Sequence, residues 1–175
     1  MSMSVSLRRK NRPQAFYQGR PKMRLYLVRH GEAVSEEVNP ERPLSQRGRL
    51  DVEKMGRFLR RAKLKVDLIW HSGKVRALET AQILGGALFV KDPPVTRQGL
   101  APLDPIKLIE NQLRKREEDL MIVGHLPFLG KLASSLVSGS SSPDLVTFQA
   151  GGVACLERLE GGSWRLEWIL SPGLL

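Results

Sequence analysis

Apolar and polar positions along this chain predict strands and helices in turn. Short apolar runs predict strands at 23–29, 66–70 and 120–123. Helical spacing predicts helices at 45–63, 74–87, 127–137 and from 104 or 105 to 117. The stretch between Pro93 and Pro102 is rich in proline and leaves room for at most a short strand.

The first predicted helix has a clear start and an expected buried side. Ser45 is a favourable N-cap residue, because its hydroxyl can accept a hydrogen bond from a free backbone N–H of the first turn. The apolar side is expected to carry Leu50, Met55, Phe58 and Leu59.

The last quarter of the chain has the alternation of a β-hairpin. Strands are predicted at Val153–Leu159 and Trp164–Ile169, and Gly161-Gly162 supplies the turn. Strand and helix units followed by a hairpin predict a three-layer α/β/α sandwich, with a mostly parallel sheet and antiparallel strands at its edge. Residues 23–175 are expected to form a single domain.

Composition agrees with a globular domain. The chain has 175 residues, of which 41% are hydrophobic and 26% charged, enough to bury a core. No apolar run approaches the roughly 20 residues of a membrane helix, so no membrane partner is expected. The single cysteine, Cys155, excludes an internal disulfide and suits a reducing compartment, so a cytoplasmic location is expected.

The positive charge is concentrated at one end. The net charge is +10, but residues 1–22 hold six of the 28 basic residues and none of the 18 acidic ones. The remainder is only mildly basic and lacks the basic aromatic pattern of a nucleic-acid-binding domain, so no nucleic-acid partner is expected. Residues 1–22 have no apolar core of a secretory signal and are expected to be a disordered leader; a transit peptide and an over-long start before Met23 are the alternatives.

Removing residues 1–22 is expected to leave both activity and stability nearly unchanged. The segment is polar and basic, and Phe16 and Tyr17 are too few apolar groups to dock firmly. Denaturant unfolding and activity assays of the truncated and full-length chains test this. A loss of more than about 1 kcal/mol of unfolding free energy would mean that the two aromatic side chains pack on the domain.

All three histidines of the chain follow a predicted strand. His30, His71 and His125 come directly after apolar runs, at the point where each strand gives way to a loop. In an open α/β sheet the carboxyl ends of parallel strands line one crevice, where ligands bind. The three imidazoles and the arginines near them are therefore expected to share one pocket.

Arg29-His30-Gly31 has the composition of a nucleophile beside an anion site. A neutral imidazole can attack phosphorus, and nearby guanidinium groups keep it neutral by lowering its pKa. Gly31 allows the backbone to approach closely or to adopt a positive φ. Arg76 stands in the first turn of a predicted helix, where free N–H groups already favour an anion, and its planar fork can hold two phosphate oxygens.

These segments together resemble the histidine phosphatase superfamily, the group that includes the phosphoglycerate mutases. The resemblance rests on Arg29-His30-Gly31, on Ser72 with Arg76-Ala77 and Thr80, and on Gly124-His125. Further segments resemble its small SixA-type phosphohistidine phosphatases: Arg42-Pro43-Leu44-Ser45 with Gly48, Gly99-Leu100-Ala101-Pro102, His125-Leu126-Pro127 with Gly130, and Trp168 with Ser171-Pro172. The resemblance extends from about Met23 to Pro172.

The resemblance implies a role for five of these side chains. His30 would be the nucleophile that becomes phosphorylated, and His125 the second imidazole of the pocket. Arg29 and Arg76 would hold the phosphoryl oxygens, and Arg42 would be an additional arginine of the same pocket.

Two departures from the family pattern concern specificity. Ser72-Gly73 replaces the usual Ser-Pro and is preceded by His71, which has no assigned role and is expected at the mouth of the crevice. The segment 85–102 is too short for the lid that carries a glutamate acid in the larger members. Glu36 and Glu37, in the polar loop after His30, are the candidates for a proton donor.

The expected function is that of a metal-independent phosphatase that acts through a phosphohistidine at His30 and has no cofactor. A phosphohistidine-bearing protein, such as a phosphorelay domain, is the expected partner, because its leaving imidazole needs protonation less than an alkoxide does. A small-molecule phosphomonoesterase and a non-catalytic phosphate-binding module are the alternatives. A three-histidine metal site is not expected, because the arginines repel a cation and no His-x-x-His spacing occurs.

Overall fold

The computed structural model describes residues 23–141 and 145–175. The elements follow one another as β1 (Met23–Arg29), α1 (Gln46–Arg61), β2 (Leu68–His71), α2 (Val75–Leu88), β3 (Val95–Thr96), α3 (Lys107–Leu113), β4 (Leu120–Gly124), α4 (Phe128–Ser138), β5 (Val153–Arg158), β6 (Trp164–Leu170) and a short 3-10 helix, η2 (Pro172–Leu174). The predicted leader, residues 1–22, lies outside the described residues.

The sheet has the order β3-β2-β4-β1-β5-β6. Strands β1 to β4 pair in parallel, whereas β5 pairs antiparallel with both β1 and β6. Parallel pairing requires a crossover between strands, which the helices provide, while β5 and β6 are joined by a short hairpin. The predicted fold class, a mostly parallel sheet with an antiparallel hairpin at one edge, is confirmed.

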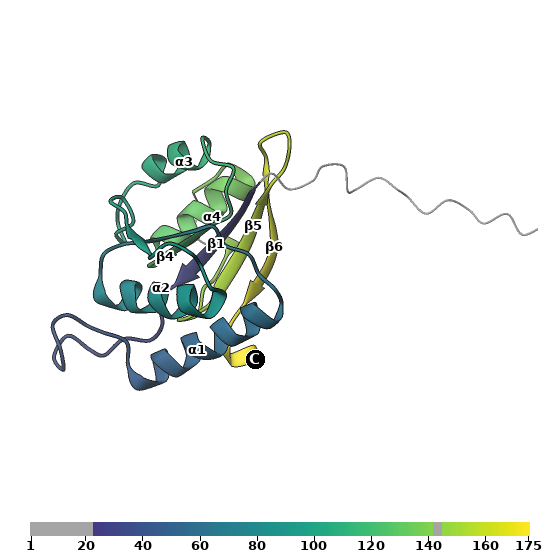
Figure 1. Ribbon diagram of the computed structural model, residues 1–175. Helices are drawn as coiled ribbons and strands as arrows, with labels where there is room; N and C mark the ends of the chain where they lie inside the picture. The colour runs from purple at the N-terminus through teal and green to yellow at the C-terminus, as the bar shows by residue number, and fades with distance from the viewer. Residues whose placement is uncertain (1–22, 142–144) are drawn as a thin grey trace, which may run out of the picture.

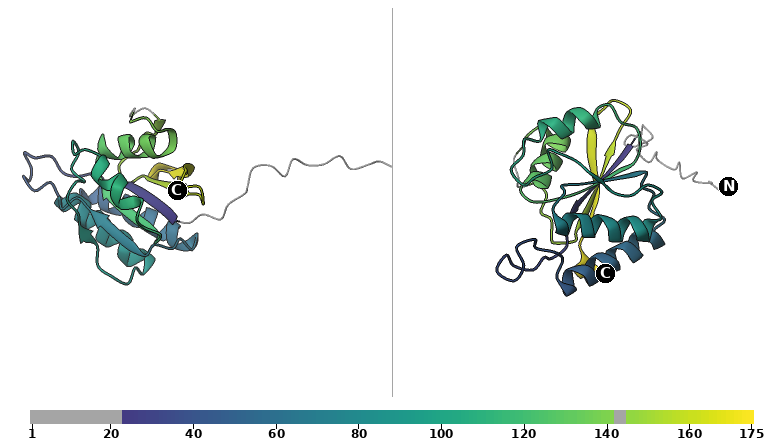
Figure 2. Two further views of the ribbon diagram at one scale, coloured as in Figure 1. Left: turned by 90° about the horizontal axis from the view of Figure 1, so that it is seen from above. Right: turned by 60° about the vertical axis from the view of Figure 1, so that its left-hand side comes forward.

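Helices cover both faces of the sheet, α1 and α2 on one and α3 and α4 on the other (Figures 1 and 2). Strand β1 shows why, since its successive side chains point to opposite faces. Leu25 and Leu27 pack in the core beneath α3 and α4, whereas Tyr26 and Val28 pack beneath α1 and α2. All four side chains are fully buried, as expected of a strand in the middle layer of three.

The buried side of α1 differs from the prediction. Ser45 is the N-cap as expected, and its hydroxyl accepts a hydrogen bond of 3.0 Å from Gly48 N. The core is contacted by Val52, Met55 and Leu59, three positions at helical spacing. Leu50 and Phe58 were wrongly predicted to lie on this side: they are 56% and 43% exposed.

The bounds of β2 and α3 also differ from the sequence prediction. β2 begins at Leu68 rather than at 66 and continues through His71, and α3 ends at Leu113, four residues before the predicted end at 117.

Across the described part of the chain, no helix has the length and apolar character needed to cross a membrane.

Candidate active site

The candidate site lies where the parallel strands β1, β2 and β4 end. Arg29 lies opposite Gly124 in the β1–β4 pair, and the next residue, His30, donates its backbone N–H to Gly124 O at 3.1 Å. This register places His30 and His125 side by side, with ring centroids 4.9 Å apart. Of the three imidazoles expected to share one pocket, His30 and His125 therefore lie together.

The hydrogen bonds of His30 define which ring nitrogen is free. Nδ1 lies 2.7 Å from the carbonyl oxygen of Gly31. A carbonyl can only accept, so Nδ1 carries the proton and donates it to this bond. Nε2 then keeps its lone pair, and it accepts a long hydrogen bond of 3.3 Å from Nε of Arg76. The side chain presents an unprotonated nitrogen beside a guanidinium group.

Three arginines act on the His30 imidazole through their charge. The guanidinium groups of Arg76, Arg29 and Arg42 all lower the pKa of His30. Arg76 projects from the first turn of α2, and both its burial and the nearby Arg42 lower its own pKa. Arg29 is oriented by a bond of 2.8 Å from Nη1 to Phe148 O. Like charges gathered in this way repel one another and are stabilised by a bound oxyanion, so the cluster suits a phosphoryl group.

Both imidazoles are neutral at physiological pH. Burial, opposed by the hydrogen bond to Gly31 and assisted by the three arginines, lowers the pKa of His30 to about 4. Burial also lowers the pKa of His125 to about 3, with further contributions from His30, Arg76 and Lys74. A neutral imidazole is the form that can act as a nucleophile, so the protein holds His30 in its reactive state.

The two pKa shifts predict a characteristic pH dependence. As pH falls from 6.5 towards 4, unfolded histidines bind protons while His30 and His125 stay neutral, so the free energy of unfolding should decrease. The neutral nucleophile should persist over the same interval. Imidazole NMR titration of the two residues, alongside denaturant unfolding at each pH, checks this. Titration of His30 near pH 6.5 would show that its environment does not exclude the charged form.

A buried threonine connects the nucleophile loop to the helix that carries Arg76. The Thr80 hydroxyl donates to Arg76 O at 2.7 Å and accepts from Gly31 N at 3.1 Å. Thr80 is fully buried, so no water can replace these bonds. The contact holds two segments that are 49 residues apart in the relative position that brings Nε of Arg76 to Nε2 of His30.

Replacing Thr80 with valine should lower both kcat and the free energy of unfolding. The change keeps the shape but removes the acceptor for Gly31 N, which leaves a buried donor unpaired at a cost of about 1–3 kcal/mol. We expect kcat to fall by roughly tenfold or more because the arginine and the imidazole lose their register. Steady-state kinetics and denaturant unfolding check this, and Thr80→Ser, which retains the hydroxyl, should recover most of kcat.

The loop between β1 and α1 projects from the body of the molecule and is anchored by its own hydrogen bonds (Figure 1). Arg42 adopts a positive φ of 49° and is held by its backbone N–H, 2.9 Å from Asn39 O, and by its Nε, 3.3 Å from Val34 O. The end of the loop is fixed to α2, because Glu79 accepts from Leu44 N at 2.6 Å. These contacts bring Arg42 back to the pocket.

Gly31 and Gly48 let the loop and helix α1 meet at close range. A Cβ on Gly48 would lie 2.0 Å from Glu32 O, and a Cβ on Gly31 would lie 2.8 Å from a methyl carbon of Val52. Gly31 does not have a positive φ. The need for a glycine at this position is therefore explained by the close approach of other atoms and not by conformational freedom. The backbone at the nucleophile is thus clamped against the start of α1.

His71 does not lie at the mouth of the site, and that expectation is wrong. The side chain is 2% exposed because β2 continues one residue further than predicted. Its Nδ1 accepts from Gly73 N at 3.1 Å, and its Nε2 lies 3.2 Å from the Thr96 hydroxyl. His71 therefore fixes the turn after β2 against β3.

Within 23–141 and 145–175 there is no group of three His, Cys, Asp or Glu side chains that could hold a metal ion.

Ser72 contacts the second imidazole, a role that the sequence had not assigned. Its hydroxyl lies 2.6 Å from Nε2 of His125. The hydroxyl can donate to an unprotonated Nε2 or accept from a protonated one, so it fixes the ring in either tautomer. The Ser72 position in the family motif was the available signal, but the pairing with a residue 53 positions later is visible only in the fold.

Glu36 and Glu37 lie in the exposed part of the projecting loop. A general acid at neutral pH needs a raised pKa, which burial or a neighbouring negative charge would provide. Hydrogen bonds within the loop, the largest from Ser35, instead lower the pKa of Glu37. Neither exposed glutamate therefore has the buried environment that would adapt it to protonate a leaving group at this site.

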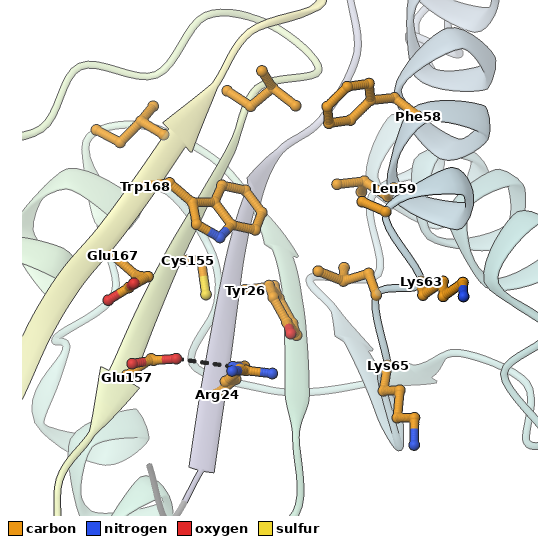
Figure 3. Close-up of a pocket in the computed structure, with 14 residues that line it drawn as sticks. Arg24, Tyr26, Phe58, Leu59, Lys63, Lys65, Cys155, Glu157, Glu167 and Trp168 are labelled. Carbon is orange, nitrogen blue, oxygen red and sulfur yellow. Dashed lines mark hydrogen bonds and ion pairs between the residues drawn. The ribbon is translucent and has the colours of Figure 1, made fainter. Parts of the chain in front are cut away.

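A groove lies apart from the candidate site. It has a volume of about 710 Å³ and runs between the end of α1 and strands β5 and β6 (Figure 3). Tyr26 and Trp168 line it, and the ion pair of Arg24 and Glu157 closes one end (Figure 3). None of the residues that line it belongs to the histidine and arginine cluster. The groove is therefore separate from the candidate site.

Comparison with known proteins identifies the family of this chain. The model of the histidine phosphatase superfamily (branch 1) matches residues 25–104, which include Arg29, His30, Arg42 and Arg76. An uncharacterized protein of Picosynechococcus sp. (strain ATCC 27264 / PCC 7002 / PR-6) is 31% identical over 152 residues, covering 83% of this chain and 89% of that one. The phosphohistidine phosphatase SixA of Escherichia coli (strain K12) is 24% identical over 155 residues, covering 86% and 94%.

The fold has the same relatives. A structure of the protein histidine phosphatase SixA complexed with tungstate superimposes with a TM-score of 0.78 at 24% identity, covering 87% of this chain and 99% of that chain. The chain belongs to the histidine phosphatase superfamily, branch 1. Membership in this superfamily, together with SixA-like relatives, supports phosphatase activity.

Proposed function

We propose that this protein is a phosphohydrolase that acts through a phosphohistidine at Nε2 of His30 and removes phosphate from protein phosphohistidine. The observation that carries the proposal is the state of that nitrogen. It is unprotonated, belongs to an imidazole with a pKa of about 4, and lies 3.3 Å from Nε of Arg76 within a cluster of three arginines.

In the first step the lone pair of Nε2 forms a bond to phosphorus while the bond from phosphorus to the leaving group breaks. The leaving imidazole of the substrate takes that electron pair and departs as a neutral imidazole when its other ring nitrogen carries a proton. Arg29, Arg42 and Arg76 stabilise the charge spread over the phosphoryl oxygens. Arg76 must exchange its hydrogen bond to Nε2 for one to a phosphoryl oxygen. At 3.3 Å the hydrogen bond to Nε2 is long and weak, so little free energy is lost in this exchange.

In the second step a water molecule attacks the phosphorus of the phosphohistidine, and the electrons of the N–P bond return to Nε2. The proton stays on Nδ1, which donates a hydrogen bond to Gly31 O throughout, so His30 leaves as a neutral imidazole in its starting tautomer. His125 lies beside His30 and is neutral, so it can hold the incoming water or the leaving group by hydrogen bonding.

The substrate preference follows from the leaving group. The imidazole of phosphohistidine leaves more readily than an alkoxide, which requires a proton from a general acid. Glu36 and Glu37 are exposed, and Glu37 has a lowered pKa, so neither supports ester hydrolysis strongly. The segment between α2 and α3 carries only β3 and turns, which leaves the site open to a protein side chain.

The relatives support the same kind of substrate. The Escherichia coli relative is a phosphohistidine phosphatase by name, and the superimposed SixA structure holds tungstate, a tetrahedral oxyanion like phosphate. A protein that carries phosphohistidine is therefore the proposed partner. A non-catalytic phosphate-binding module fits less well, because His30 lies next to the arginines instead of being buried away from them.

The proposal is tested by comparing kcat/KM for a phosphohistidine-bearing protein domain with values for phosphoserine, phosphotyrosine and sugar phosphates. We expect the phosphohistidine domain to be preferred by at least about tenfold, because the weaker demand for protonation favours it. A sugar phosphate or nucleotide hydrolysed with equal efficiency would instead identify a small-molecule phosphomonoesterase. In that case Glu36 and Glu37 would again become the candidates for the acid.

A further inference from the structure

We propose that the groove between the end of α1 and strands β5 and β6 binds a small amphipathic carboxylate, with its apolar part beside Trp168 and its carboxylate beside Tyr26. The groove is separate from the histidine and arginine cluster, and the inference does not depend on the proposed function. Its volume of about 710 Å³ lies within the range of sites that bind small organic molecules. Like such sites, it combines an apolar lining with a few polar groups.

The apolar part of the groove is formed by three aromatic side chains (Figure 3). The rings of Tyr26, on β1, and Trp168, on β6, lie with their centroids 6.2 Å apart. Phe58 lines the groove from α1 and is 43% exposed, whereas the next residue, Leu59, is buried. The groove therefore accounts for an aromatic residue on the open side of α1. An apolar group bound among these rings would remove apolar surface from water, which is favourable.

The hydroxyl of Tyr26 lacks a hydrogen-bond acceptor. Tyr26 lines the groove and is fully buried, and its hydroxyl has no hydrogen-bond partner within the described residues. The charge of Arg24 acts on this hydroxyl, but a guanidinium can only donate and offers no acceptor. Burial is the largest cause that raises the pKa of Tyr26, so the phenol keeps its proton. A ligand oxygen that accepts from it would satisfy a donor that is costly to bury unpaired.

The charged groups of the groove favour an anion. Lys63 and Lys65, on the segment between α1 and β2, line it and have no ion-pair partner within residues 23–141 and 145–175. Both carboxylates of the lining are already paired with arginines, Glu157 with Arg24 at 2.9 Å and Glu167 with Arg165 at 3.2 Å. A carboxylate is the group that supplies both the acceptor that Tyr26 lacks and the negative charge that the lysines lack.

Hydrocinnamate is the probe, and hydrocinnamyl alcohol is its uncharged control. Each is titrated into the isotope-labelled full-length protein by NMR, with excess inorganic phosphate present to occupy the arginine cluster. We expect hydrocinnamate to shift the indole N–H signal of Trp168 with a dissociation constant on the order of 1 mM. The signals of Trp70 and Trp164, which do not line the groove, should change little. The alcohol should bind at least about fivefold more weakly, because it carries no charge.

Tyr26→Phe distinguishes a ligand contact from a structural one. The variant removes only the hydroxyl, so hydrocinnamate should bind about tenfold more weakly, since a hydrogen bond to a charged group is lost. The free energy of unfolding without ligand should not fall, because the hydroxyl has no partner to lose. Lys65→Met should weaken binding by about twofold to threefold. Lys91→Met is its control, because Lys91 is exposed beyond the end of α2 and does not line the groove.

Four outcomes would overturn the inference. They are a Trp168 signal that shows no saturable shift, equal binding of the alcohol, unchanged affinity in Tyr26→Phe, and a loss of stability in Tyr26→Phe without ligand. The last would show that the hydroxyl is bonded within the protein. Removing residues 1–22 should leave the affinity for hydrocinnamate unchanged. A clear gain in affinity would show that this segment, and not a small carboxylate, covers the groove in the full-length chain.

Discussion

His30→Ala should abolish turnover while leaving the fold intact. The variant removes the nitrogen that attacks phosphorus, and loss of a covalent nucleophile lowers kcat on the order of 10⁴-fold or more. His30 lies in a loop at the end of β1 and contributes no apolar surface to either core cluster, so its removal creates no core cavity. Hydrolysis of p-nitrophenyl phosphate and phosphoramidate by both proteins measures the effect.

His71→Ala provides the matched control for this variant. His71 is the last residue of the parallel strand β2, but it is buried and hydrogen-bonded to Gly73 and the Thr96 side chain. Its removal should lower the free energy of unfolding by about 1–3 kcal/mol, because it leaves buried groups without a partner, and should affect kcat far less. Activity of His30→Ala within tenfold of the wild type would rule out the nucleophile assignment.

Arg76→Lys should lose most of the activity although it keeps the charge. A lysine ammonium cannot reproduce the planar fork that holds two phosphoryl oxygens, nor the bond from Nε to Nε2 of His30. The loss of one preorganised contact to a transferring group costs roughly 2–4 kcal/mol, or about 30-fold to 10³-fold in kcat. Steady-state kinetics on phosphoramidate measure this loss.

Arg57→Lys controls for the general effect of replacing arginine with lysine. Arg57 lies on the exposed side of α1, with 62% of its side chain accessible and its Nη1 4.0 Å from the Glu53 carboxylate. Its replacement should leave kcat unchanged within twofold, since exposed pairs of this kind contribute little. Nearly full activity of Arg76→Lys would mean that the site needs a positive charge and not a bidentate grip.

The elements that the sequence predicted well are those whose pattern has one physical cause. Strand β1 and strand β4 are buried on both faces, so they appear as unbroken apolar runs whose ends are easy to place. The positions of His30, Arg29 and His125 follow directly, because each stands at the end of such a run. The helix N-cap at Ser45 was equally local, since a side chain and its own first turn define it.

Features that depend on contacts between distant segments could not be predicted. Phe58 is as apolar as Leu59, and only the position of α2 and the sheet decides which of them is buried. The sequence predicted His71 in the crevice, because no local pattern shows that β2 continues through this residue. Thr80 belongs to a recognisable motif, but its bond to Gly31 N joins residues 49 positions apart, which no local pattern encodes.

The most direct test of the account is to trap the phosphorylated enzyme and locate the phosphate. Brief reaction of the protein with phosphoramidate, followed by alkaline quenching, peptide mapping and ³¹P NMR, identifies both the residue and the ring nitrogen. Because Nδ1 of His30 is hydrogen-bonded to Gly31 O and Nε2 faces Arg76, we expect the phosphate on Nε2 of His30. Phosphate on Nδ1, on His125 or on no histidine at all would contradict it.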